Sequence, residues 1–138
     1  MKIFPELKTS SKVDFRILAG SRGCENGNND SLVVLAKYND RASFLFTGDA
    51  ETENDGDCEG EVPVLVDFYR ANKLLDVDVY KVGHHGSRNA SDEDFLRAMS
   101  PRISVISAGF HTQHTPGPYH AFQFGHPREG IIAFGGLH

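Results

Sequence analysis

The stretch FLFTGDAE, residues 44–51, ends an apolar run abruptly at Gly48 and Asp49. The apolar residues within 42–48 predict a strand, and Gly-Asp is common in turns. One interpretation is therefore an ordinary turn at the end of a strand. The other is that Asp49 is a metal ligand held at the edge of a sheet, and the surrounding sequence has to favour one of them.

The pattern of apolar residues on both sides of this stretch predicts an α/β domain. The turn at 39–41 is short enough to join its flanking strands as an antiparallel hairpin. Strands followed by alternating helices and strands predict a mixed sheet with helices on one face. The long apolar stretch at 31–38 further predicts a strand covered on both faces. The expected strands are 13–18, 31–38, 42–48, 76–83, 102–109 and 131–135, and the expected helices are 62–75 and 91–100, the second capped by Ser91.

Length and charge set limits on the class of protein. The 138 residues suit one domain, residues 1–138, and the net charge of −5 without a basic block disfavours tight nucleic-acid binding. No apolar stretch reaches the length of a membrane span, so no membrane segment is expected.

Cys24 and Cys58 could pair, but two distant thiols are no disulfide framework. This favours a reducing, cytoplasmic setting.

The stretch DAETENDGDCEGE, residues 49–61, contains seven acidic residues. A solvated acidic loop is the simplest interpretation of such a charge run. Beyond Asp49, this stretch therefore suggests no site by itself.

The strongest local signal is VYKVGHHGS, residues 79–87, in which a predicted strand delivers His84 and His85 to its carboxyl end. Neighbouring residues of a strand point to opposite sides, so only one of the two histidines is expected to face a given site. Neutral imidazoles and carboxylates are the ligands of hydrolytic metal ions. Asp49 and His84, both at strand ends, therefore form a candidate metal site.

Together with NNDSLVVLAKY, SPRISVISAG and GHP, these motifs resemble the later part of the metallo-β-lactamase fold. The similarity is closest to the branch typified by the lactamase-like domain of bacterial DNA-uptake (competence) proteins and extends from about residue 13 to 135. The resemblance implies half of an αββα sandwich and a cleft that holds zinc or manganese. It also implies that Asp49 bridges the metal ions, that His84 or His85 is a ligand, and that Ser87 and His126 contact substrate.

The chain departs from the family pattern in its first half. The His-x-His-x-Asp-His signature is absent, and Asn28 and Asn29 stand where a histidine is expected before the strand at 31–38. Three explanations stay open: a fragment of a longer protein, a dimer in which each copy supplies one half, or completion of the site by local histidines such as His111 and His114. The dimer has a physical cause, since a sheet covered on one face leaves an apolar surface that seeks a partner.

These features lead to the hypothesis of a metal-dependent hydrolase that acts on a small-molecule or nucleotide-like phosphodiester. Asp49, His84, His85, His111 and His114 would hold the metal, and Asp49, His85, Ser87 and His126 would take part in catalysis. A non-catalytic, self-associating half-domain is the alternative from another class. Hydrolysis of a lactone or β-lactam on the same fold is a third possibility.

Overall fold

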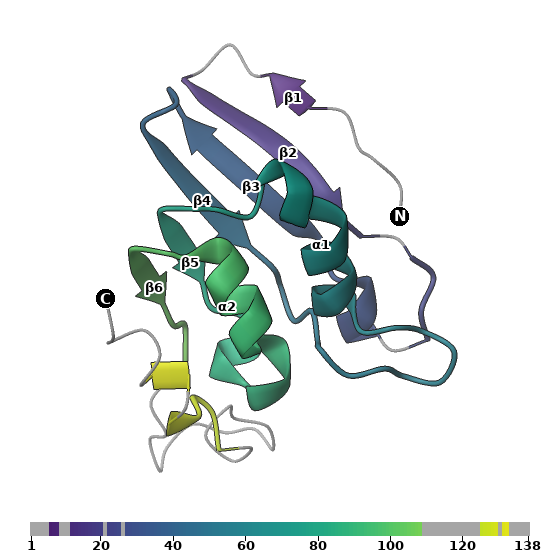
Figure 1. Cartoon of the computed structure of the whole chain (residues 1–138). Helices are drawn as coiled ribbons and strands as arrows, with labels where there is room; N and C mark the ends of the chain where they lie inside the picture. Colours follow the sequence, from purple (N-terminus) through teal and green to yellow (C-terminus); the bar gives the residue numbers. More distant parts are fainter. Residues whose placement is uncertain are drawn as a thin grey trace, which may run out of the picture.

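The computed structural model describes residues 6–8, 12–20, 22–25, 27–108, 125–129 and 131–132. One six-stranded sheet runs through this part of the chain in the order β1-β2-β3-β4-β5-β6 (Figure 1). Its strands are β1 (Glu6–Lys8), β2 (Val13–Ala19), β3 (Val33–Tyr38), β4 (Ala42–Phe46), β5 (Val79–Lys81) and β6 (Ile103–Val105). No helix in these ranges is long and apolar enough to cross a membrane.

The first four strands form an antiparallel meander, and the last three are parallel. Asn39 and Asp40 join β3 to β4 with φ values of 48° and 52°. Left-handed residues in so short a loop, 39–41, suit the right-handed twist of a hairpin. The predicted hairpin and mixed sheet are therefore confirmed. Strands β3 to β6 are shorter than expected, β2 extends one residue further, and β1 was not predicted.

Two helical connections make the parallel crossovers. The α1 helix (Glu61–Tyr69), extended by the 3₁₀ turn η2 (Arg70–Asn72), leads from β4 to β5, and α2 (Glu93–Met99) leads from β5 to β6. The predicted cap of α2 was wrong by one residue: the Asp92 carboxylate accepts the Phe95 amide at 2.8 Å. Ser91 is instead buried and hydrogen-bonded to the Tyr80 hydroxyl.

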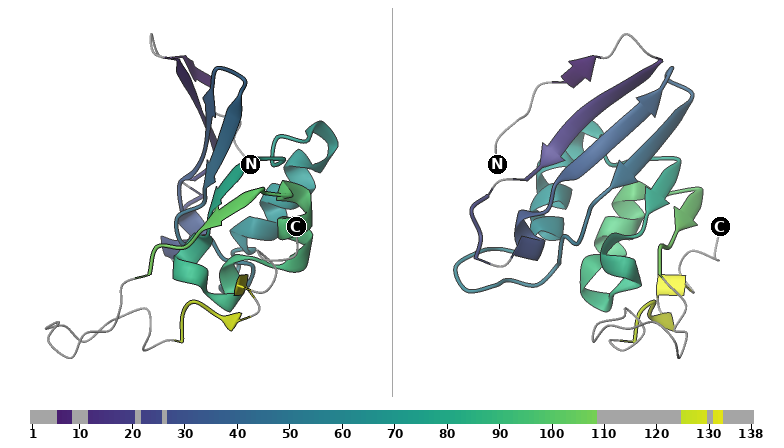
Figure 2. Two further views of the ribbon diagram at one scale, coloured as in Figure 1. Left: turned by 90° about the vertical axis from the view of Figure 1, so that its left-hand side faces the viewer. Right: turned by 180° about the vertical axis from the view of Figure 1, so that it is seen from behind.

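Both helices lie on the same face of the sheet, as Figure 2 shows most clearly in its edge-on view. On this covered face, Leu35 pairs with Leu45, which in turn pairs with Tyr80. All three side chains are at most 2% exposed. They pack in one core with the apolar stripe of α1 and with α2; the helix residues in this core are Val62, Leu65, Val66, Tyr69, Phe95, Leu96 and Met99.

The opposite face, here called the open face, carries two rows of mainly apolar residues that follow from the strand register. One row is Phe15, Ala36, Phe44, Val79 and Ile103, and the other is Ile17, Val34, Phe46, Lys81 and Val105. Phe46, Ile103 and Val105 are 43%, 57% and 48% exposed. The expectation that the strand at 31–38 is covered on both faces holds only in part: the two crossover helices cover one face, while on the open face Val34 is half-buried and Ala36 is 6% exposed.

The final predicted strand, 131–135, was also wrong where the structure describes it. Ile131 and Ile132 both donate their amides to the Arg128 carbonyl, which forms a helical turn. The rest of that stretch lies outside the described residues.

Candidate functional site at the ends of strands β4 and β5

The residues that follow β4 and β5 lie side by side at the carboxyl ends of these two parallel strands. The His84 amide donates to the Gly48 carbonyl at 3.0 Å, which joins the two loops through their backbones. Asp49 is half-buried, and its amide donates to the Ser31 hydroxyl at 3.1 Å. The structure therefore brings the Asp49 and His84 segments together, while a cation shared by their side chains stays a prediction.

His84 and His85 form part of a tight 3₁₀ turn, η3 (Gly83–Gly86), rather than an extension of β5. Both adopt left-handed backbone conformations, with φ of 41° and 54°. Non-glycine residues in this region are strained and cluster at functional sites. The expected alternation of the two side chains was therefore wrong, since their rings lie 6.4 Å apart, edge to face.

Each of the two histidines is oriented by a different partner. The His85 Nδ1 lies 2.7 Å from the Ser107 carbonyl oxygen, so Nδ1 carries the proton and donates it. The His84 Nδ1 lies 3.3 Å from a carboxylate oxygen of Glu51, which is itself buried and accepts the Asn28 amide at 2.9 Å.

His126 joins this cluster from the far end of the chain. Its ring centroid lies 5.5 Å from that of His84. The pKa of His126 is lowered first by burial and then by the positive charges of His84, Arg128 and His85. Three nitrogen-bearing side chains thus lie close enough to His126 to oppose its protonation.

The segment that carries His126 is held against η3 by a close backbone approach. The Arg128 amide donates to the Gly86 carbonyl at 3.0 Å. A Cβ at Gly86, which has φ +84°, would lie 2.7 Å from the Pro127 Cβ. Position 86 therefore requires glycine for both its conformation and its contact.

Ser87 is also in place, but its hydroxyl is directed elsewhere. It is buried, its amide donates to the His84 carbonyl at 2.9 Å, and its hydroxyl donates to Asn89. His111 and His114 lie outside the described residues. The structure therefore gathers five of the predicted site residues at the carboxyl ends of β4 and β5: Asp49, His84, His85, Ser87 and His126.

The zinc or manganese site is not assembled within the part of the chain that the structure describes. No group of three or more His, Cys, Asp or Glu side chains there is arranged to hold a metal ion. Asp49, His84 and His85 are the predicted ligands within these residues, and they do not form such a group. Because a catalytic zinc takes three protein ligands, these residues alone do not fit one.

Glu51 and Asn28 are the site residues that the sequence did not reveal as such. Glu51 belongs to the acidic stretch 49–61, which was expected to be solvated. Glu51 and Glu61 are instead 8% and 1% exposed. Asn28 was noted only as a replacement for a missing histidine.

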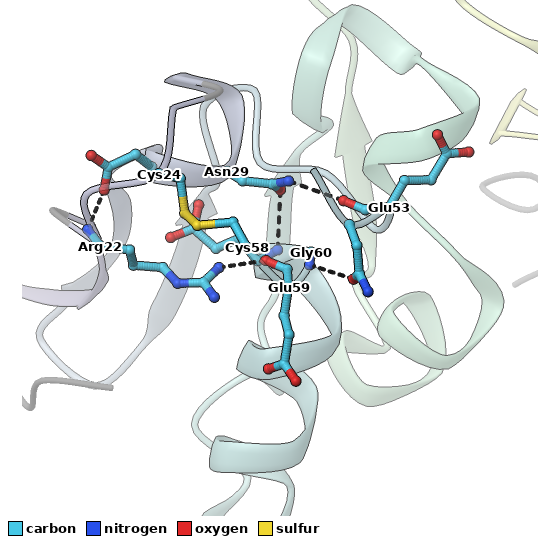
Figure 3. The surroundings of a disulfide bond; sticks show 10 residues. Arg22, Cys24, Asn29, Glu53, Cys58, Glu59 and Gly60 are labelled. Carbon is cyan, nitrogen blue, oxygen red and sulfur yellow. Dashed lines mark hydrogen bonds between the residues drawn. A yellow bond between two sulfur atoms is a disulfide. The ribbon is translucent and has the colours of Figure 1, made fainter. Parts of the chain in front are cut away.

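The two cysteines pair, which the sequence allowed but did not favour. Cys24 and Cys58 form a disulfide with their Cα atoms 5.9 Å apart (Figure 3). It joins a first loop, residues 22–25 and 27–31, to a second loop, residues 49–60. These two loops, here called the clamp, carry Asn28 and Glu51 to the site.

Three known proteins match most of this chain in sequence. The chain is similar to bacterial competence proteins. It is 30% identical over 120 residues to ComE operon protein 3 of Bacillus subtilis, and 31% identical over 119 residues to competence protein ComA of Neisseria gonorrhoeae. It is also 30% identical over 95 residues to recombination protein 2 of Haemophilus influenzae. No protein-family model matches the chain.

The matches cover most of this chain but little of each relative. They span 87%, 86% and 69% of the chain, and 13%, 14% and 10% of the respective relatives. The relatives are named for competence and recombination, not as hydrolases. The prediction of a metal-dependent hydrolase was therefore wrong, whereas the predicted link to competence proteins is supported.

Proposed function

We propose that this chain forms a domain of a competence protein and contributes to the handling of DNA during its uptake. The observation that carries this proposal is the similarity to three competence or recombination proteins across most of the chain. The chain spans only about an eighth of their length, so its role is that of one part of a larger protein.

Within this role, the surface formed by His84, His85 and Arg128, beside the buried His126, contacts the phosphodiester backbone of a DNA strand. Guanidinium and imidazole groups donate hydrogen bonds to phosphate oxygens. The pKa of His126 is lowered first by its burial and then by the charges of the other three groups, which lie close to it. Because the whole chain carries a net charge of −5, the contact is local and weak rather than tight.

Fluorescence anisotropy with a labelled single-stranded oligonucleotide tests this contact. Weak binding is expected, with an affinity that falls as salt rises. Arg128→Ala should lower the affinity and reduce the slope of log K against log salt by roughly 0.7, the value for one phosphate contact on a single strand.

Arg41→Ala is the matched control, because Arg41 is also exposed but precedes β4, at the opposite end of that strand from the site. It removes the same charge and should leave the slope unchanged. Equal losses for both variants would mean that the chain binds DNA only through its overall charge, which would overturn the assignment of this surface.

The open face supports a second proposal, that the sheet is one half of a metallo-β-lactamase-type sandwich. Four apolar side chains of this face, Phe15, Phe46, Ile103 and Val105, are 39–57% exposed. A second copy of the chain, packed open face to open face, would bury them. Native mass spectrometry should then find a dimer, and a monomer at all concentrations would contradict self-association.

Two further expectations are separate proposals with their own tests. Zinc or manganese at Asp49 and His84 would need further ligands, for which His111 and His114, outside the described residues, are the predicted candidates. Elemental analysis of the chain against an Asp49→Ala, His84→Ala double variant tests this; metal that is equal in both would exclude the site. The disulfide supports an oxidising compartment in place of the cytoplasm, because glutathione keeps cytosolic thiols reduced. Thiol labelling of the protein in its source cells would find free cysteines if that were wrong.

A further inference from the structure

The clamp is held together by non-covalent contacts as well as by the disulfide. The Arg22 guanidinium donates to the Glu59 carbonyl at 2.9 Å, and the Asn29 amide donates to the Glu53 carbonyl at 3.0 Å (Figure 3). Both bonds cross from the first loop to the second. The disulfide therefore adds a covalent link to hydrogen bonds that connect the same two loops.

The inner side of the clamp is anchored on the start of α1. The Asn29 side-chain oxygen accepts the Glu61 amide at 3.2 Å, and the Glu51 carbonyl accepts the Val62 amide at 3.0 Å. A Cβ at Gly60 would lie 2.3 Å from the Thr52 carbonyl oxygen, so the second loop passes directly against the helix start. Each loop thus supplies an acceptor to the first turn of α1.

The clamp also encloses the carboxyl group of Glu61, which stays buried only while the two loops are closed. Glu61 is 1% exposed, and neither of its carboxyl oxygens has a hydrogen-bond partner of good geometry among the described residues. Burial of such a group is costly unless it stays neutral. Opening of the loops would admit water to Glu61, so the two loops are expected to separate readily once the disulfide is lost.

The clamp reaches the candidate site through two of its own residues. Asn28 from the first loop donates to Glu51 of the second loop, and the same Glu51 oxygen lies 3.3 Å from the His84 Nδ1. Asn28 thus links the Glu51 carboxylate to the first loop. His85 differs, because its partner is the Ser107 carbonyl, outside the clamp.

We infer that the disulfide-fastened clamp positions Glu51 against His84, so that reduction of the Cys24–Cys58 bond releases His84 from its partner. Both cysteines are half-buried, which leaves them accessible to a small reductant. A dithiol such as dithiothreitol supplies two electrons and two protons, breaks the S–S bond into two thiols, and closes into a cyclic disulfide. The consequence for DNA contact rests on the proposed function, whereas the release of His84 does not.

Nuclear magnetic resonance of the ¹⁵N-labelled chain, with and without dithiothreitol, tests the inference directly. On reduction, the ring nitrogen signals of His84 should move while those of His85 stay in place. The amides of Glu61 and Val62 should exchange at least about tenfold faster, while the amides of β3 and β4 keep their protection, as expected for local opening.

Two variants keep the test decisive. A Cys24→Ser, Cys58→Ser double variant should match the reduced chain and show no response to dithiothreitol. Glu51→Gln should move the His84 signals in the oxidised chain without faster exchange of the Glu61 amide. Protection of the β3 and β4 amides reports that each variant is folded.

Two results would overturn the inference. The first is His84 signals that are identical in the oxidised and reduced chains although the Glu61 amide loses protection. The second is a reduced chain that keeps full protection at Glu61, since the clamp would then hold without its disulfide. Oligonucleotide affinity, measured separately, should fall on reduction; a chain that binds no DNA but still shows the His84 response would contradict only the proposed function.

Discussion

The covered face and the open face of the sheet are built from the same kinds of residues, yet they differ in what happens to them. Leu45 on the covered face is fully buried, whereas its neighbour Phe46 on the open face is 43% exposed. Alternation along a strand makes both faces apolar, but the crossovers through α1 and α2 cover only one. The comparison shows that an apolar pattern along a strand does not by itself tell whether a face of the sheet is covered. The helices that pack on the sheet decide this.

The largest expected effect comes from truncating one residue on each face. Leu45→Ala should lower the free energy of unfolding by about 2–5 kcal/mol, because it leaves a cavity in the core. Phe46→Ala should cost about 1 kcal/mol or less in the monomer, since its side chain already contacts water. Urea denaturation measures both, and equal losses would mean that the open face is covered in solution.

The covered side also encloses an ionisable group, and this predicts a pH dependence that the open face does not have. Burial raises the pKa of Glu61 from 4.5 to about 8; the Arg22 charge and the Ser31 amide lower it, and the Asp30 charge raises it. Between these two values the unfolded chain has released the proton that the folded chain keeps. The unfolded state then binds fewer protons, so stability falls as pH rises from about 4.5 to 8.

Glu61→Gln removes this titration and tests it. The variant should lose less stability than the native chain between pH 5 and pH 8, by a difference on the order of 3 kcal/mol. Thermal or urea unfolding at several pH values measures the difference. Glu59→Gln, at an exposed position of the same loop, is the control and should follow the native chain; parallel curves for all three proteins would show that Glu61 is not buried.

A smaller effect is expected at the cap of α2, one of the two helices that make the covered face. Asp92→Ala removes the acceptor for the Phe95 amide and should cost about 1 kcal/mol. Asp92→Asn, which keeps an acceptor, should recover most of the loss in urea denaturation. If Asn were no better than Ala, the carboxylate would stabilise the helix only by its charge.

The smallest effect on stability is expected at the edge of the open face. Ile103→Lys should change the free energy of unfolding by about 0.5 kcal/mol or less, because the side chain is already exposed. If the open face pairs with a second copy, the same change should abolish the dimer seen by native mass spectrometry. A dimer that survives it would have to use another surface.

Much of the fold could be predicted from local patterns. The alternation at 13–18, the turn at 39–41 and the amphipathic stripe of α1 each act over a few residues, so the strands, the hairpin and the helix were visible in the sequence. The gathering of Asp49, His84 and Ser87 at one edge was also predictable, since each follows a strand. Prediction failed where a local pattern was compatible with several environments, as in the acidic stretch 49–61.

The amino-acid sequence by itself therefore determined the element order, the mixed sheet and the histidine-rich strand end, because hydrophobic periodicity and turn residues act between near neighbours. Only the tertiary structure decided that Cys24 meets Cys58, across 34 positions, and that Glu51 lies between Asn28 and His84. It also decided that Glu61 is buried while its acidic neighbours are not. These outcomes depend on how the clamp loops pack on the start of α1, and contacts between residues so far apart leave no periodic signal in the chain.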